Sequence, residues 1–247
     1  MSDPIPQNRR RRGIYLLPNL FTSAALFAGF YAITSALSQR YELAAVAIFV
    51  AMVLDGMDGR VARLTNTQSA FGAEYDSMAD LISFGAAPAL VMYVWALAPL
   101  GKLGWVAAFV HCAGAALRLA RFNTQLATAD KRYFQGLPSP SAAAILAGFI
   151  WVCDVHEIKG ADVAYIGLGL AIATGLLMVS NFRYYSFKEV DLRGRMPFVK
   201  AILIMLAFAV IFTNPSLTLF LLFLTYAISG PTVTLLTLRR KRGERKV

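Results

Sequence analysis

The sequence predicts an all-α polytopic membrane protein with about eight transmembrane helices. Hydrophobic residues make up 57% of its 247 residues and charged residues only 15%, and the mean hydropathy is +0.57. Most of the apolar residues fall into stretches of near-spanning length, which an ordinary soluble domain does not contain. Because backbone groups in lipid must be bonded within their own segment, and the stretches lack the alternation of barrel strands, we expect helices.

Eight apolar segments define the expected helices in chain order. The first, at 14–37, follows a basic run, but it is long and no convincing cleavage site precedes the next segment, so we expect it to be retained. The second and third, at 42–62 and 72–98, contain a group of acidic residues. The other five segments are mostly apolar and cover residues 103–122, 140–156, 162–181, 197–213 and 216–238. No internal repeat divides the chain, and we expect one domain over residues 1–247.

The distribution of basic residues predicts the orientation of the chain in the membrane. Basic segments lie at both ends, at 1–13 and 239–247, and if the N-terminus is cytoplasmic only Arg40, Lys102 and Lys159 of the 24 basic residues lie outside. This is the positive-inside pattern, so we expect both termini in the cytoplasm and the protein in a bacterial inner membrane. Topology and attraction to anionic lipid explain the net charge of +10 better than nucleic-acid binding does, and we expect no nucleic-acid partner.

Four aspartates are the most informative residues of the chain: Asp55, Asp58, Asp76 and Asp80. A carboxylate near hydrocarbon costs roughly 2.5 to 3.5 kcal/mol on insertion scales, so it persists mainly where function or a bound cation offsets that cost. Hard oxygen ligands in this number favour Mg²⁺, Mn²⁺ or Ca²⁺ over zinc or copper. The sequence therefore predicts a divalent-metal site.

Helical spacing predicts that these carboxylates meet. One polar stripe on the second helix has residues three or four apart: Asp55, Asp58, Gly59, Ala62 and Arg63. A stripe on the third helix has the same spacing: Gly72, Asp76 and Asp80. Small residues at the seam allow the two backbones to approach closely, which would bring both carboxylate pairs to one point. With the orientation given above, we expect an active-site cavity that faces the cytoplasm.

The two stripes together read DxxDGxxAR, eight residues, then GxxxDxxxD, over residues 55–80. This pattern resembles the signature of the CDP-alcohol phosphotransferase family, integral membrane enzymes that move a substituted phosphate from a CDP-linked donor to an alcohol. The segments DSMADLISFGAAPA, LRLARFNT, FQGLPSPSAAA and SNFRYYSFK resemble the multi-spanning members that use CDP-diacylglycerol and L-serine. The resemblance extends over most of residues 15–190.

The resemblance implies roles for the signature residues. Asp55, Asp58 and Asp76 would hold a divalent cation, Mn²⁺ or Mg²⁺, while Asp80 would complete the cluster and act as the general base. The nucleotide donor would contact a further set of residues: Asn19 and Thr22 on the first helix, Gly59 and Ala62 beside the nucleotide, Arg63 facing the diphosphate, and Gly72 near the cytidine.

The acceptor site is less explicit in the sequence. Serine carries a carboxylate and an ammonium group, so its pocket needs cationic groups and at least one oxygen acceptor. We expect the acceptor to be bound by residues near the cytoplasmic ends of the fourth and sixth helices: Arg118, Arg121, Asn123 and Lys188. The alternative is that the basic members of this set are only cytoplasmic anchors that follow the positive-inside rule.

Two competing functions remain open from the sequence. Within the family, the acceptor could instead be glycerol 3-phosphate, inositol phosphate or choline. From another class, a cation-coupled transporter could also use intramembrane carboxylates, but all the acid lies at one membrane face and no second cluster completes a path. Since family members are often dimers, we expect a homodimer embedded in the lipid bilayer.

Overall fold

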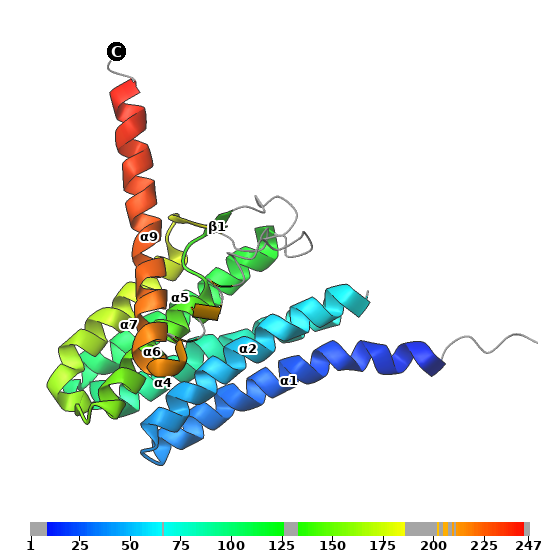
Figure 1. The fold of residues 1–247 in the computed structure, drawn as a ribbon, viewed down its shortest axis with the longest axis horizontal. Helices are drawn as coiled ribbons and strands as arrows, with labels where there is room; N and C mark the ends of the chain where they lie inside the picture. Colours follow the sequence, from blue (N-terminus) through cyan, green and yellow to red (C-terminus); the bar gives the residue numbers. More distant parts are fainter. Residues whose placement is uncertain are drawn as a thin grey trace, which may run out of the picture.

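The computed structural model describes residues 9–65, 67–125, 133–185 and 211–244, together with residues 202, 205, 206 and 209. Its long helices are α1 (Arg9–Leu37), α2 (Tyr41–Thr65), α5 (Lys102–Gln125), α6 (Ser139–Val155), α7 (Ala164–Val179) and α9 (Pro215–Glu244). Helices α1 and α2 lie side by side, α5 packs on α7, and α6 packs between α2 and α9. Figure 1 shows α9 extending past the other helices to the C-terminus.

Five helical stretches of the described chain are long and apolar enough to cross a membrane: Pro18–Leu37, Ala70–Leu100, Lys102–Thr124, Gly160–Val179 and Pro215–Leu235. The prediction of a largely helical membrane protein is therefore confirmed. Helix α6 is apolar but shorter, at 17 residues, and α2 carries charged residues over its last three turns. The expected span at 197–213 lies mostly outside the described residues.

The third expected span is irregular rather than one regular helix. It consists of α3 (Ala70–Asp80), a π-helix η1 (Leu81–Ala86), α4 (Ala87–Met92), a second π-helix η2 (Tyr93–Leu97) and a 3₁₀ turn η3 (Ala98–Leu100). A further 3₁₀ turn, η4 (Gly160–Val163), precedes α7. Pro88 lies at the start of α4, and proline removes the N–H that would continue the α-helical ladder.

Two short strands, which the sequence did not predict, pair outside the helices. β1 (Tyr133–Gln135) and β2 (Arg183–Tyr185) run antiparallel, with Phe134 opposite Tyr184. The strands follow α5 and α7, and so they tie the ends of these helices together. Tyr184 is fully buried and its hydroxyl donates to the carbonyl of Ala227 on α9, 3.0 Å away. Gly230 makes room for this ring, because a Cβ there would lie 2.3 Å from it.

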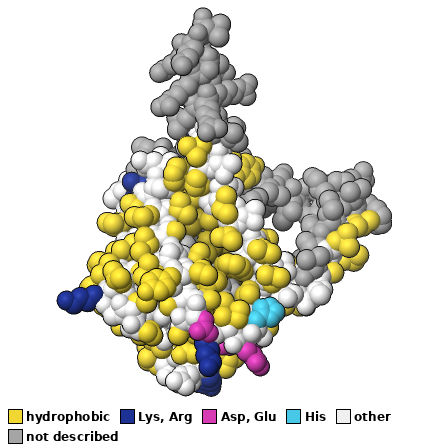
Figure 2. Space-filling model, turned by 90° about the vertical axis from the view of Figure 1, so that its left-hand side faces the viewer, with side chains coloured by type: hydrophobic (Ala, Val, Ile, Leu, Met, Phe, Trp, Pro, Cys, Tyr) yellow, Lys and Arg dark blue, Asp and Glu magenta, His cyan; other side chains and the backbone are white. Residues whose placement is uncertain are grey.

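Alanine forms much of the interior. On α1 the buried residues include Ala28, Ala32 and Ala36, and on α2 they include Ala44 and Ala45. Such small side chains let two helices approach closely, which is the usual way in which helices associate in lipid. Many large hydrophobic side chains are exposed, and Figure 2 shows hydrophobic side chains spread over the face of the molecule with charged groups confined to a few places. This distribution suits a surface that contacts lipid.

Candidate active site

The acidic residues occupy the facing parts of α2 and α3. Asp55 and Asp58 lie one turn apart near the C-terminal end of α2. A short connection leads into α3, whose N-terminus is capped by the Ser69 hydroxyl, which accepts a hydrogen bond from the Gly72 N–H at 3.0 Å. Asp80 is the last residue of α3, immediately before the π-helix η1.

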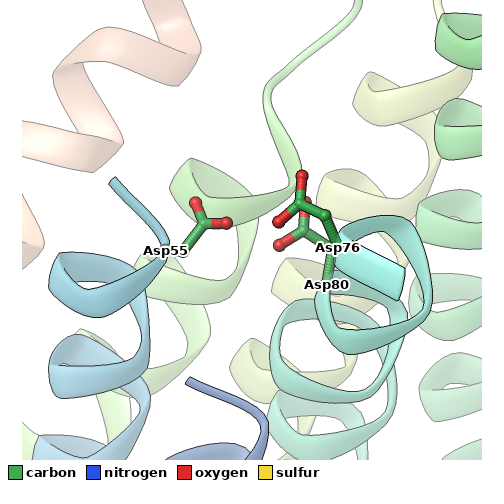
Figure 3. A group of neighbouring side chains, drawn as sticks. All are labelled: Asp55, Asp76 and Asp80. Atoms are coloured by element: carbon green, nitrogen blue, oxygen red, sulfur yellow. The ribbon is translucent and has the colours of Figure 1, made fainter. Parts of the chain in front are cut away.

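Three of the four aspartates form a close cluster. One carboxylate oxygen from each of Asp55, Asp76 and Asp80 lies within 4.8 Å of the other two. Figure 3 shows Asp76 and Asp80 on one helix, directed toward Asp55 on the other. The spacing in the sequence thus brings two helices together through their acidic faces, as expected.

Asp58 lies beside this cluster and is bound from a different side. Its side chain is buried, and its Oδ2 accepts a hydrogen bond from the Thr22 hydroxyl of α1 at 2.8 Å. Its carboxyl group also lies close enough to that of Asp76 for direct electrostatic interaction. Helix α1 therefore contacts the acidic site through Thr22. The family resemblance had implied that Thr22 binds the nucleotide donor.

The carboxylates fit a divalent cation. The carboxylates of Asp58 and Asp76 interact electrostatically, as do those of Asp55 and Asp80, and like charges at such distances repel. In addition, Asp76 has a buried Oδ1 atom without a hydrogen-bond partner. A cation would relieve the repulsion and supply that missing partner, and a donor set made only of carboxylate oxygens suits Mg²⁺ or Mn²⁺. The cluster can therefore bind a metal ion; its geometry does not select one ion.

The other residues expected at the donor site lie around the same two helices. A Cβ built on Gly72 would lie 3.4 Å from the Asn19 side-chain oxygen, so α1 and α3 approach closely there. A Cβ built on Gly59 would lie 3.5 Å from the guanidinium of Arg63, which places that cation over the small residue. Ala62, on the following turn of α2, is partly exposed.

Arg118 lies next to the aspartates. It is close enough to Asp80 and Asp55 for direct electrostatic interaction, and to Tyr226 of α9 as well. Its Nη1 donates to the Ser139 hydroxyl at the start of α6, 2.8 Å away. Its Nε atom is buried and has no hydrogen-bond partner, so this guanidinium has a donor left for another group.

The other residues expected to bind the acceptor differ in their surroundings. Arg121 donates to the carbonyl of Val179 at 3.2 Å, and so it satisfies a backbone group at the end of α7. Asn123 donates to the Ser77 hydroxyl of α3 at 3.0 Å, which joins α5 to the helix that carries two of the aspartates. Lys188 lies outside the described residues.

An apolar groove that no sequence pattern predicts opens beside the cluster. It has a volume of about 1050 Å³ and is formed where α2, α6, β2 and α9 meet. Its lining includes Arg60, Pro138, Tyr185, Leu221, Phe223 and Tyr226. Since Tyr226 also lies next to Arg118, the groove adjoins the polar site. These residues come from four distant parts of the chain, so no local pattern reveals them.

Known proteins resemble this chain over most of its length. Two proteins of Helicobacter pylori strains, both named CDP-diacylglycerol–serine O-phosphatidyltransferase, are 37% identical over 218 residues, covering 87% of this chain and 90% of theirs. A Mycobacterium bovis protein of the same name is 40% identical over 151 residues, covering 59% of this chain and 52% of its own. A Methanocaldococcus jannaschii protein of that name is 39% identical over 137 residues, covering 56% of this chain and 61% of its own.

The profile of a single enzyme family covers the two acidic helices, the basic residues of α5 and most of the groove. It is described as CDP-alcohol phosphatidyltransferase and matches residues 15–229. The match spans the whole acidic site, including the Thr22 contact. On this evidence the chain belongs to the CDP-alcohol phosphatidyltransferase family.

Proposed function

We propose that this protein transfers the phosphatidyl group of CDP-diacylglycerol to the hydroxyl of L-serine, giving phosphatidylserine and CMP. The observation that carries the proposal is the cluster of Asp55, Asp76 and Asp80, with one oxygen of each carboxylate within 4.8 Å of the others, inside the range that the family model matches. Relatives named for this reaction extend over 87% of the chain. The serine-accepting activity expected from the sequence agrees with the names of these relatives.

The four aspartates would hold the divalent cation between them, with Asp58 oriented by Thr22. When bound, a divalent cation neutralises the donor diphosphate and stabilises the departing CMP. Family membership supports a divalent-metal requirement, and the choice between Mn²⁺ and Mg²⁺ is left to experiment. Arg63 would face the same diphosphate, and Gly59, Ala62, Gly72 and Asn19 would leave room for and contact the nucleotide.

Asp80 would act as the general base. The serine hydroxyl oxygen forms a bond to the phosphorus that bears the diacylglycerol, the bond from that phosphorus to the CMP oxygen breaks, and the hydroxyl proton passes to Asp80. A carboxylate is a weak base for an alcohol, so its help is largest late in bond formation, when the hydroxyl has become more acidic. The remainder of the catalysis is positioning and charge stabilisation, as in other phosphoryl transfers.

Arg118 is the strongest candidate for binding the serine carboxylate. It lies next to Asp80, and its buried Nε still lacks a hydrogen-bond partner. An arginine at this position could bind the carboxylate while the serine hydroxyl reaches the base. Arg121 and Asn123 already bond Val179 and Ser77, so they would support the pocket mainly by fixing α5. Lys188 remains a further candidate from the sequence.

The apolar groove would hold the diacylglycerol chains of the donor. It is large enough, at about 1050 Å³, and Arg60 at its edge suits the phosphate end of a lipid. The chain would form one domain of eight spans in a bacterial inner membrane, with both termini in the cytoplasm. In this orientation soluble serine would enter the site from the cytoplasm, and the lipid donor would enter from the bilayer. A homodimer remains a prediction from the sequence alone.

One assay tests this proposal against its alternatives. Purified full-length protein in detergent is given CDP-diacylglycerol with L-serine, glycerol 3-phosphate, inositol phosphate or choline, and CMP release is followed. We expect release that depends on L-serine. Preference for another alcohol would overturn the acceptor assignment. No release with any alcohol, together with cation flux through the protein in liposomes, would instead favour a transporter.

A further inference from the structure

The helix that follows Asp80 contains an interruption with a defined cause. In a regular α-helix the carbonyl of Phe84 would accept from the N–H of residue 88, but residue 88 is proline and has none. The chain responds with the π-helix η1, in which the Ala87 N–H bonds the carbonyl of Ile82, five residues back. The carbonyl of Phe84 thus needs a donor from outside its α-helical ladder.

His111 of α5 supplies such a donor. The residue is fully buried, and its Nε2 lies 3.2 Å from the carbonyl oxygen of Phe84. A carbonyl only accepts, so Nε2 carries the proton in this bond. Its Nδ1 lies 2.8 Å from the hydroxyl of Thr174 on α7, which donates to it when the ring is uncharged. Both ring nitrogens are therefore satisfied, and three helices are linked.

Small residues make this link possible. A Cβ on Gly114 would lie 2.5 Å from the carbonyl oxygen of Gly175, and a Cβ on Gly175 would lie 2.6 Å from that of Val110. Backbone contact between α5 and α7 therefore requires glycine at both positions. Since His111 and Thr174 lie one turn or less from this crossing, the close approach keeps their side chains at hydrogen-bond distance.

The opposite side of the same turn is held by α1. The Ser83 hydroxyl donates to the carbonyl of Ala25 at 3.1 Å, and a Cβ on Gly29 would lie 2.6 Å from the Ser83 oxygen. The π-helical turn is thus fixed by α1 on one side and by His111 on the other. Asp80 is the residue that immediately precedes this turn.

We propose that His111 is a positioning residue: through its bond to the Phe84 carbonyl it fixes the π-helical turn and thereby the placement of the Asp80 carboxylate in the acidic cluster. The role of Asp80 itself rests on the proposed function. The described hydrogen bonds of His111 go to Phe84 and Thr174 and not to the cluster, so it acts through the backbone of the helix that presents Asp80. A misplacement of about 1 Å in a reacting group can cost about a hundredfold in rate.

The test compares His111→Leu with His111→Gln in full-length protein in detergent. Leu cannot donate to Phe84, whereas Gln can. For His111→Leu we expect kcat for CMP release to fall about tenfold or more at saturating Mn²⁺, with KM for CDP-diacylglycerol unchanged. Binding of Mn²⁺ alone, followed by electron paramagnetic resonance, should weaken about tenfold. His111→Gln should restore most of both values. Ser35→Ala is the control and should match wild type, because Ser35 is a buried serine of α1 whose hydroxyl has no hydrogen-bond partner.

Two outcomes would overturn the inference. One is a folded His111→Leu variant with wild-type kcat and Mn²⁺ affinity; the other is a His111→Gln variant as impaired as His111→Leu. If His111→Leu does not stay folded, Thr174→Val replaces it, because it removes the partner of Nδ1 and should change both readouts in the same direction. A wild-type protein inactive with serine would refute the proposed function, while the Mn²⁺ measurement would still decide the role of His111.

Discussion

Replacement of Thr22 by valine removes the hydrogen bond that joins α1 to an aspartate of the acidic site. The Thr22 hydroxyl lies 2.8 Å from Asp58 Oδ2 and 3.2 Å from the carbonyl oxygen of Pro18. A hydroxyl has a single proton, and the shorter contact to a carboxylate is the stronger of the two. Valine has nearly the same shape, so the substitution deletes the donor with little change in packing.

The expected size of the effect follows from the charge on the acceptor. A hydrogen bond to a charged group contributes about 1.5 to 3 kcal/mol, and about 1.4 kcal/mol corresponds to a factor of ten in an equilibrium constant. The affinity for Mn²⁺ should therefore fall about tenfold to a hundredfold, which is also the usual effect of removing a residue that orients a metal ligand. Activity at limiting Mn²⁺ should fall with it and recover as Mn²⁺ is raised.

The assay is a Mn²⁺ titration by electron paramagnetic resonance, paired with CMP release at increasing Mn²⁺. Thr22→Ser keeps the hydroxyl and should bind nearly as well as wild type. Thr34→Val is the matched control, because its hydroxyl lies on the same helix but donates to the Tyr31 carbonyl at an exposed position. If Thr22→Val bound Mn²⁺ as tightly as Thr34→Val, the bond from α1 would have no part in metal binding.

Four further outcomes are expected. Exhaustive chelation should abolish CMP release and Mn²⁺ or Mg²⁺ should restore it, since the carboxylates otherwise repel one another; full activity after chelation would remove the metal from the mechanism. Asp80→Asn should retain less than about a tenth of the turnover while donor binding survives, whereas Asp55→Asn should weaken both, as a binding assay with CDP-diacylglycerol can determine. Arg118→Ala should raise the serine KM about tenfold to a hundredfold, and Arg121→Ala should raise it less because its guanidinium already bonds a backbone carbonyl; equal effects would contradict this division. Gly230→Ala should lower the thermal stability in detergent, because its Cβ would meet the Tyr184 ring at 2.3 Å, and an unchanged melting temperature would refute that contact.

The acidic site could be predicted from the sequence because its information is local. Residues three or four apart on a helix share a face whatever the rest of the chain does, so the pairs Asp55 with Asp58 and Asp76 with Asp80 were fixed in advance. Whether the two acidic helices pack against each other depends on tertiary structure. The small residues on their facing sides predicted that they do. The resemblance to the family rested on the same spacing, whereas the resemblance to its serine-using members rested on other segments, such as LRLARFNT and FQGLPSPSAAA.

The features that escaped prediction depend on contacts between distant segments. Pro88 signals a disturbed helix, but not that His111, on the next long helix, would donate to the Phe84 carbonyl. The strand that contains Tyr184 is too short to carry an alternating pattern, and only its pairing with residues 133–135 defines it. Helix periodicity likewise could not show that Arg118 would lie against Asp80 while Arg121 bonds the end of α7.

The buried alanines between α1 and α2 set the distance between these helices, and the hydrogen bond from Thr22 to Asp58 depends on that distance. Alanine has no side-chain rotamers to lose when it is buried, and lipid gives two helices no hydrophobic reason to associate. Packing α1 against α2 through buried alanines such as Ala32 and Ala44 therefore loses little side-chain conformational entropy. Many short-range dispersion contacts hold the two helices together. A bulky residue there would wedge the helices apart and draw Thr22 away from Asp58, several turns from the change. Inactivating substitutions should consequently occur along this seam, far from any charged group.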